Sequence, residues 1–145
     1  MNFEVKTKIK ILKPVSDVFE AIVDPAKMSN YWFSSGSGRL EQGKTVTLRY
    51  DEYDAKLDIK VIEYEVNKKI VYLWSASGEE TVVTITLKEL DTTGTIIEVN
   101  EKGWKKDDDS LISKLLGQKE GWVYVLTCLK AYLEFGVNLR GALVF

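Results

Sequence analysis

The stretch GWVYVLTCLKAYLEFG, residues 121–136, decides the fold, because it forms a helix whose apolar face is unusually wide. At about 100° per residue, one stripe of side chains runs along its centre: Trp122, Val125, Leu126, Leu129, Tyr132 and Leu133. Tyr124, Cys128 and Phe135 widen the apolar arc to about 200°, against the ~100° of an ordinary surface helix. A flat sheet would not cover so wide an arc, so we expect this helix to lie inside a strongly curved sheet.

The chain before this helix predicts a strand, two short helices and a run of further strands. Residues 3–11 alternate apolar and charged side chains, which is typical of a half-buried antiparallel strand. Pro14 opens a helix that ends at Asp24-Pro25, and residues 26–32 form a second short helix. Turn sequences then separate six antiparallel strands, which we predict at 37–41, 45–51, 56–66, 69–75, 80–89 and 94–100.

The C-terminal part completes the predicted fold. Residues 110–116 form a turn or two of helix, Gly117 bends or interrupts it, and the final helix covers 118–136 with Gly136 as its cap. The predicted class is α+β: a strongly curved seven-stranded antiparallel sheet, in the order β-α-α-β6-α, wrapped around a long C-terminal helix. We expect residues 1–145 to form a single domain. A sheet that grips a helix leaves space at one end, which predicts a cavity unless large side chains fill it.

Composition excludes several classes of function. Twenty basic and twenty-two acidic residues give a net charge of −2, which argues against a general nucleic-acid binder. The chain has no histidine and a single cysteine, Cys128, so we expect no metal site, no intramolecular disulfide and no cofactor. The N-terminal residues lack the apolar run of a signal peptide, and no stretch is long and apolar enough to span a membrane. A cytoplasmic protein is the expectation.

Three motifs resemble those of a known family. Residues 13–32 (KPVSDVFEAIVDPAKMSNYW) combine Pro, Val-Phe, Asp-Pro and Trp; residues 68–74 (KKIVYLW) form an aromatic strand; and residues 121–134 (GWVYVLTCLKAYLE) combine Gly-Trp with Leu-x-x-Leu-Lys and Leu-Glu. In these motifs the chain resembles the family of activator of heat-shock-90 ATPase homologues, within the START-related, birch-pollen-allergen-like (SRPBCC) superfamily. The segment 104–119 and the tail VNLRGALVF (137–145) depart from the family pattern.

The resemblance implies a helix-grip fold and several alternative functions. The superfamily binds lipids, sterols, plant hormones and polyketides, and some of its branches are cyclases or hydrolases. Small single-domain members are mostly uncharacterised and are presumed to bind small apolar ligands. In the co-chaperone that names the family, a separate domain binds the chaperone, and we expect no such domain in 145 residues.

Candidate lining residues of the cavity are large aromatic residues near the concave face of the sheet and apolar residues of the gripped helix. The resemblance implies that this helix forms the lid of the cavity. They are Trp32, Tyr50, Tyr72, Trp74, Trp104, Trp122, Leu126 and Leu129. Tyr72 and Trp74 share one face of their strand, so they point inward together or, if Val71 and Leu73 are inward, not at all. Aromatic walls are usual both in ligand pockets and in cores, so plain core packing is the competing interpretation of each.

No catalytic motif stands out. Glu98 lies in an apolar strand, but alternation with Ile97 and Val99 predicts that it faces solvent. Cys128 has no histidine to activate it and is predicted to be a small core residue. We therefore expect a non-enzymatic binding protein for a small hydrophobic molecule. The alternatives are a protein-interaction module, with a chaperone or a second copy of the chain as partner, and a cyclase- or hydrolase-type enzyme.

Overall fold

A computed structural model describes residues 3–106 and 108–144. Its elements, in chain order, are β1 (Glu4–Ile11), α1 (Val15–Val23), α2 (Pro25–Met28), β2 (Ser35–Gly36), β3 (Thr45–Tyr50), the 3-10 turn η1 (Asp51–Tyr53), β4 (Ala55–Glu65), β5 (Lys69–Trp74), β6 (Thr81–Asp91), β7 (Gly94–Lys102) and α3 (Leu111–Phe135). This order confirms the predicted β-α-α-β6-α arrangement.

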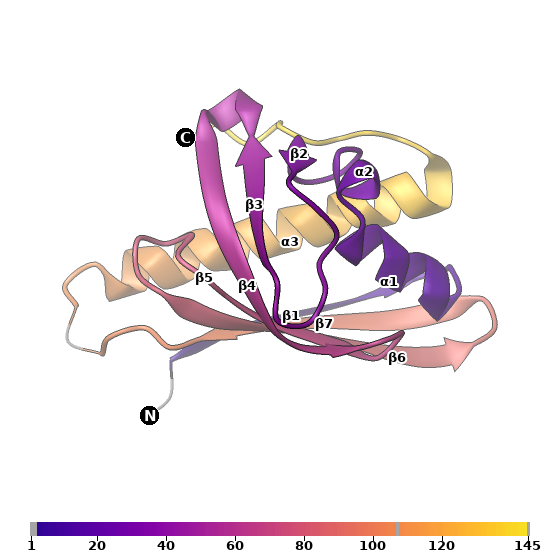
Figure 1. The fold of residues 1–145 in the computed structure, drawn as a ribbon, viewed down its shortest axis with the longest axis horizontal. Helices are drawn as coiled ribbons and strands as arrows, with labels where there is room; N and C mark the ends of the chain where they lie inside the picture. The colour runs from indigo at the N-terminus through magenta and orange to yellow at the C-terminus, as the bar shows by residue number, and fades with distance from the viewer. Residues whose placement is uncertain (1–2, 107, 145) are drawn as a thin grey trace.

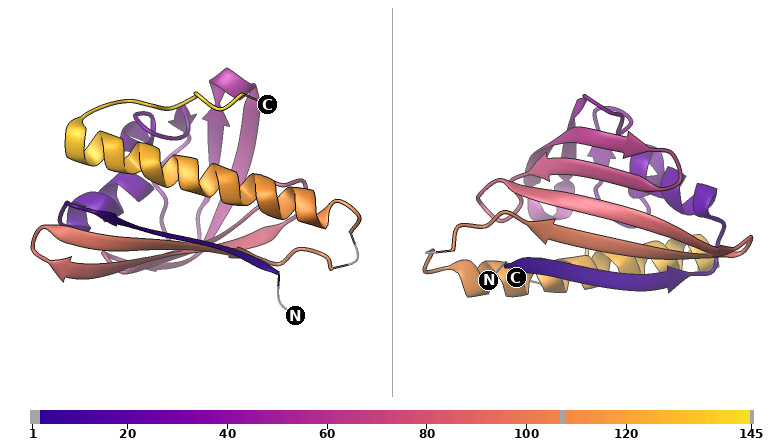
Figure 2. Two further views of the ribbon diagram at one scale, coloured as in Figure 1. Left: turned by 180° about the vertical axis from the view of Figure 1, so that it is seen from behind. Right: turned by 90° about the horizontal axis from the view of Figure 1, so that it is seen from below.

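The strands form one seven-stranded antiparallel sheet in the order β1-β7-β6-β5-β4-β3-β2. The sheet is strongly curved, so that β3 and β4 rise steeply from the plane of β1, β7 and β6, and α3 lies across the concave side (Figure 1). The two views of Figure 2 show that α3 runs along the edge strand β1 and spans the length of the sheet. The predicted helix-grip fold is therefore confirmed.

The second helix is shorter than predicted. Asp24 caps it, because its carboxylate accepts from the Ala26 N–H at 3.0 Å. The side chains of Ser29 and Asn30 then bond back to carbonyl groups within the helix and end it after Met28, so the prediction of a helix through residue 32 was wrong. The following turn directs Trp32 into the interior, where 6% of it is exposed.

The strand predicted at 37–41 was also wrong. The observed strand β2 covers only Ser35 and Gly36, which pair with Arg49 and Leu48 of β3. Gly36 allows this close approach, because a Cβ there would lie 2.8 Å from the Leu48 side chain. The chain then leaves the sheet for α1, where the Leu40 N–H donates to the Val23 carbonyl at 3.0 Å and buries the leucine.

The C-terminal helix is one continuous element of 25 residues. The predicted bend or break at Gly117 is absent, and the helix runs through this residue without interruption. Gly136 caps the helix as predicted, with φ +67° and its N–H donating to the Tyr132 carbonyl at 2.9 Å. Phe135 was wrongly assigned to the apolar arc: it is 72% exposed, since the helix has passed beyond the sheet by that turn. Within the described residues, no helix has a stretch apolar and long enough to cross a membrane.

Candidate functional site: an aromatic cavity backed by a buried carboxylate

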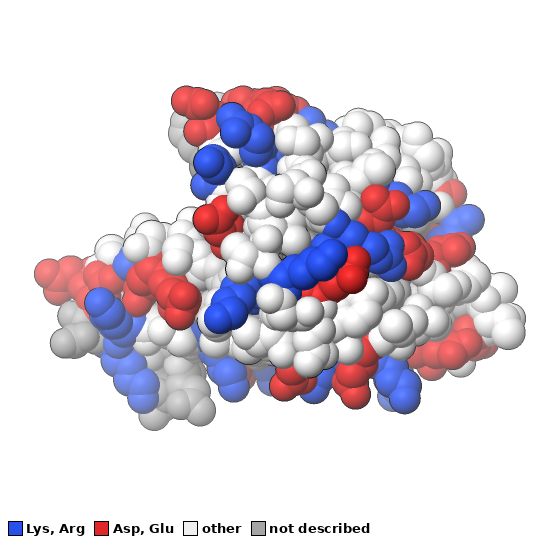
Figure 3. All heavy atoms as spheres, viewed as in Figure 1, with Lys and Arg blue, Asp and Glu red and all other residues white. Residues whose placement is uncertain are grey.

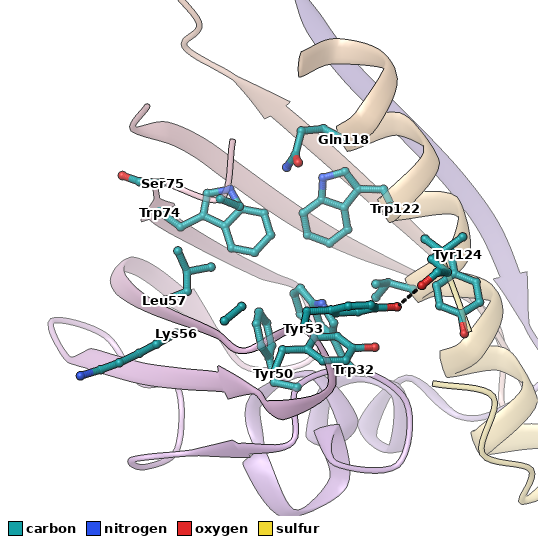
Figure 4. Close-up of a pocket in the computed structure, with 16 residues that line it drawn as sticks. Trp32, Tyr50, Tyr53, Lys56, Leu57, Trp74, Ser75, Gln118, Trp122 and Tyr124 are labelled. Carbon is teal, nitrogen blue, oxygen red and sulfur yellow. Dashed lines mark hydrogen bonds between the residues drawn. The ribbon is translucent and has the colours of Figure 1, made fainter. Parts of the chain in front are cut away.

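A cavity of about 350 Å³ lies at one end of the molecule, between α3 and the ends of β3, β4 and β5. The space-filling view shows the surface hollowed between the tip of β3 and β4 and the turn from β5 to β6 (Figure 3). Described residues that line the cavity are Trp32, Phe33, Tyr50, Tyr53, Ala55, Lys56, Leu57, Trp74, Ser75, Ala76, Gln118, Gly121, Trp122, Tyr124, Val125 and Leu143. Trp74 and Trp122 lie on one side and Tyr50 and Tyr53 on the other, and the amine of Lys56 points outward (Figure 4).

Four of the eight sequence-predicted residues meet at this wall: Trp32, Tyr50, Trp74 and Trp122. The three tryptophan rings touch one another, with centroids 5.3 Å apart for Trp74 and Trp122, 5.5 Å for Trp32 and Trp122, and 6.0 Å for Trp32 and Trp74. Trp32 crosses the other two edge-on, whereas Trp74 and Trp122 are stacked. Tertiary structure thus gathers rings from a turn, a strand and a helix into one cluster.

The structure places the other four predicted residues outside this cavity. Tyr72 points inward with Trp74 but lies deeper, fully buried, with its hydroxyl lacking a hydrogen-bond partner among the described residues. Trp104 packs beyond the β5–β6 turn and donates its N–H to the Ser77 hydroxyl at 3.0 Å. Leu126 and Leu129 border only a void of about 10 Å³ further along α3, so their observed role is helix–sheet packing.

Glu101, on β7, is the central polar group behind the cavity. It is fully buried and accepts four hydrogen bonds: from the indole N–H groups of Trp74 (3.0 Å) and Trp122 (2.8 Å), the Thr81 hydroxyl (2.6 Å) and the Gln118 amide (2.9 Å). Each carboxylate oxygen receives two of these donors. These hydrogen bonds fix the orientation of the Trp74, Trp122 and Gln118 side chains in the cavity wall.

The hydrogen-bond pattern of Glu101 fits a carboxylate that only accepts, because each of its four partners can donate. No lysine or arginine in the described part of the chain forms an ion pair with it. A buried charge without a counter-ion is costly, and here four directed donors offset the lost hydration. Burial, and then the charge of Glu101, raise the pKa of the Tyr72 phenol well above its usual range.

The tail after α3 forms the outer rim of the cavity. The Arg140 guanidinium lies over the Tyr50 ring, 4.8 Å from its centroid, and bonds the Trp32 carbonyl at 3.0 Å as well as the Glu52 carboxylate. The Gly141 N–H donates to the Tyr50 hydroxyl at 3.0 Å, and the Tyr53 hydroxyl donates to the Leu143 carbonyl at 2.8 Å. Residues 137–143 therefore connect β3 and η1 to the end of α3. Residue 145 of the predicted tail lies outside the described residues.

Sequence reasoning missed Glu101 and much of the rim. A signal for Glu101 existed: strict alternation continues from Ile97 and Val99 to position 101, which places its side chain on the core face. The predicted strand ended at residue 100 and so excluded it. As predicted, Glu98 is on the other face, half-buried. Tyr53 and Leu143 carried no comparable signal, because η1 and the tail meet only through tertiary contacts.

Comparison with known proteins places this geometry in context. A model of the family described as activator of Hsp90 ATPase homolog 1-like protein matches residues 13–134. No curated protein matches the chain significantly.

Solved structures with the same fold include protein SSP2350 from Staphylococcus saprophyticus, which is 46% identical, with a TM-score of 0.82 over 95% of this chain and 96% of that one. DynU16, from the dynemicin biosynthetic locus, is 23% identical, with a TM-score of 0.81 over 93% of this chain and 48% of its own. The Aha1 protein from Colwellia psychrerythraea, solved as a dimer, is 20% identical, with a TM-score of 0.78 over 92% and 98%. At these lower identities the last two comparisons bear on the fold alone.

Proposed function

The chain belongs to the family of activator of Hsp90 ATPase homolog 1-like proteins, and from this premise and the geometry of its cavity we propose that it binds a small hydrophobic molecule, lipid-like or aromatic. The observation that carries the proposal is the cavity of about 350 Å³ between the sheet and α3, with seven aromatic side chains among its sixteen described lining residues. Ligand sites of small molecules are concave, mostly apolar and a few hundred Å³ in volume.

The proposed role is non-catalytic binding. Among the described residues, Glu101 is the one fully buried acidic group, and its two oxygens are already occupied by four donors. It stands behind the tryptophans rather than in the cavity wall, so a ligand in the cavity does not reach it. A general base must come within hydrogen-bond reach of the proton that it removes. Burial raises the pKa of the Cys128 thiol, which favours the inert thiol form.

The experiment uses two glycines of α3 as a matched pair. Gly121 lines the cavity and Gly117 does not, and a Cβ at either position meets open space. Gly121→Leu should fill the cavity and abolish binding, whereas Gly117→Leu should leave it intact. Protein purified without denaturation would be examined by native mass spectrometry and then titrated with a panel of apolar ligands, with tryptophan fluorescence as the readout. Absence of any ligand response in the unmodified protein would contradict the proposal.

A second candidate function, self-association through the outer face of α3, has an observation of its own. Ile112, Leu116 and Val123 fall on one side of the helix at helical spacing and are 72%, 66% and 44% exposed. The Aha1 protein from Colwellia psychrerythraea, of the same fold, is described as a dimer. We propose a second copy of the chain as the partner of this stripe, in preference to a chaperone.

The oligomeric state in solution tests this second candidate. Size-exclusion chromatography with light scattering should show a dimer that Leu116→Glu dissociates, because the stripe would then carry a charge. Leu90→Glu, at the exposed end of β6, is the control and should leave the dimer intact. A monomeric unmodified protein would rule the second candidate out.

A further inference from the structure

The tryptophans of the cavity wall are electronically coupled to a buried negative charge. Both Trp74 and Trp122 donate their indole N–H to Glu101, so the ring edges point away from the cavity toward the carboxylate. Hydrogen bonds polarise their partners in a low-dielectric interior. Donation to a carboxylate pushes electron density onto the indole faces, and tryptophan already has the most attractive aromatic face for a cation.

The positive charges near the cavity lie at its edge rather than inside it. Lys56 is the one charged side chain among its described lining residues, and its amine points away from the interior (Figure 4). Glu101 has no ion-pair partner in the described part of the chain. Its field therefore reaches the cavity through the tryptophans.

One ring of the wall already holds a cation. The Arg140 guanidinium of the tail lies 4.8 Å from the centroid of the Tyr50 ring, at the rim of the same cavity. Tyr53 packs against Tyr50 from η1, with ring centroids 4.6 Å apart. The rim and the tryptophan cluster thus place aromatic groups on two sides of the cavity, and proteins use aromatic faces to recognise quaternary ammonium groups.

We propose that the cavity selects an organic cation, an inference that rests on the proposed binding function. The ligand would have an apolar or aromatic body that carries an amine or quaternary ammonium group. This group would lie against Trp74 and Trp122, in front of Glu101. The apolar body takes up the volume, and the charge supplies the selectivity. Glu101 is a positioning residue, which acts through the two indoles rather than by contact with the ligand.

The test compares two probes of nearly the same shape, phenyltrimethylammonium and its uncharged isostere tert-butylbenzene. Fluorescence titration of the unmodified protein should show the cation binding at least about tenfold more tightly, the preference expected for a desolvated cation on aromatic faces. Glu101→Gln should abolish most of this preference while tert-butylbenzene binding stays similar. Glu98→Gln removes the same charge from the opposite face of β7 and should change neither affinity.

Each other outcome has a defined meaning. If tert-butylbenzene binds as tightly as the cation or more tightly, the cation preference is wrong, while apolar binding stands. If neither probe binds but a neutral ligand of the panel does, the same conclusion holds. If no ligand binds, both proposals are wrong. Should Glu101→Gln fail to fold, the ratio in the unmodified protein still decides, and Trp74→Phe, which keeps an aromatic face without the N–H, should reduce it.

Discussion

Trp122 shows how one residue serves stability and the cavity together. It is 3% exposed, donates to Glu101, and contacts the rings of Trp32 and Trp74. Most of its surface is therefore covered by protein, and only one side of its ring reaches the cavity. Its truncation would leave a large hole beside Glu101 and deprive that carboxylate of one donor.

Trp122→Ala should lower the free energy of unfolding by about 3–5 kcal/mol, the usual cost of removing a buried tryptophan. Chemical denaturation measures the change. Val123→Ala, at the adjacent and 44% exposed position, should change it by about 0.5 kcal/mol or less. A loss well under 1 kcal/mol for Trp122→Ala, together with abolished ligand binding, would show that the residue only lines the cavity.

At the scale of single residues, the sequence patterns predicted the direction in which a side chain points better than the residues that it contacts. Alternation correctly predicted Glu98 outward, and it allowed Tyr72 and Trp74 to face inward together, which the structure shows. It could not predict that Glu101 gathers donors from positions 74, 81, 118 and 122, because these lie far apart along the chain. Only the folded sheet brings them together.

Among the elements, α3 contributes most to the architecture. Lysines on its outer edge reach the free edge of β1: Lys130 donates to the Lys10 carbonyl at 2.9 Å, and Lys119 donates to the Lys6 carbonyl. The Glu134 carboxylate accepts from the Leu12 N–H at 2.9 Å. These contacts occupy backbone groups that would otherwise invite pairing with another strand, so the helix both fills the sheet and protects its edge.

Glycines test the continuity of α3. Gly117→Ala should raise the free energy of unfolding by about 1 kcal/mol, because it adds helix propensity where a Cβ meets open space. Gly136→Ala should lower it by a similar amount, about 1 kcal/mol, since φ is +67° there. Thermal or urea unfolding of both variants checks the signs. Destabilisation by Gly117→Ala would contradict a straight helix at that residue.

The tail should loosen when its arginine is removed. In Arg140→Ala the guanidinium contacts to Trp32, Ser34 and Glu52 are lost. Amide hydrogen exchange should then accelerate at Gly141 and Ala142, whose N–H groups donate to tyrosine hydroxyls. Arg49→Ala, on an exposed position of β3, is the control. Unchanged exchange in the tail would show that the tyrosine contacts alone hold it.

Element boundaries were predictable where turn chemistry is strong and not where tertiary contacts override it. The turn at Asn67 has φ +62°, and the strands on both sides of it were predicted within a residue. Segment 37–41 was predicted as a strand, yet it lies against α1, where Leu40 is buried and its N–H donates to the Val23 carbonyl at 3.0 Å. Gly117 suggested a bend, but α3 continues through it from Leu111 to Phe135.

At the scale of the whole molecule, the wide apolar arc of the helix predicted the curvature of the sheet. Trp122 and Cys128, which lie about 120° apart around the helix, are both buried. We expected a cavity from that geometry. Its position depends on η1 and the tail, and the sequence patterns did not predict that these two segments lie at the same end of the molecule.

Buried tyrosines make the whole fold sensitive to alkali. Burial raises the pKa of Tyr50 to about 12, and it raises the pKa values of Tyr31 and Tyr72 as well. Unfolded tyrosine loses its proton near pH 10, so above that pH the unfolded state binds fewer protons than the folded state. Stability should therefore be retained below about pH 10 and fall as the pH rises toward 12 and beyond.

Urea unfolding at a series of pH values, with tyrosinate absorbance followed in parallel, measures this decline. Tyr72→Phe removes one buried phenol whose hydroxyl has no hydrogen-bond partner among the described residues, so it should make the decline shallower without loss of stability at neutral pH. Tyrosinate absorbance that appears in full near pH 10 in the folded protein would contradict the burial of these groups.

The most direct test of ligand binding in the cavity is the response of the four indole N–H signals in a nitrogen–proton correlation spectrum during titration with the ligand panel. Trp32, Trp74 and Trp122 line the cavity, and Trp104 lies outside it. A bound ligand should shift the signals of the first three in a saturable way and leave that of Trp104 in place. No shift with any ligand, or a shift confined to Trp104, would contradict binding in this cavity.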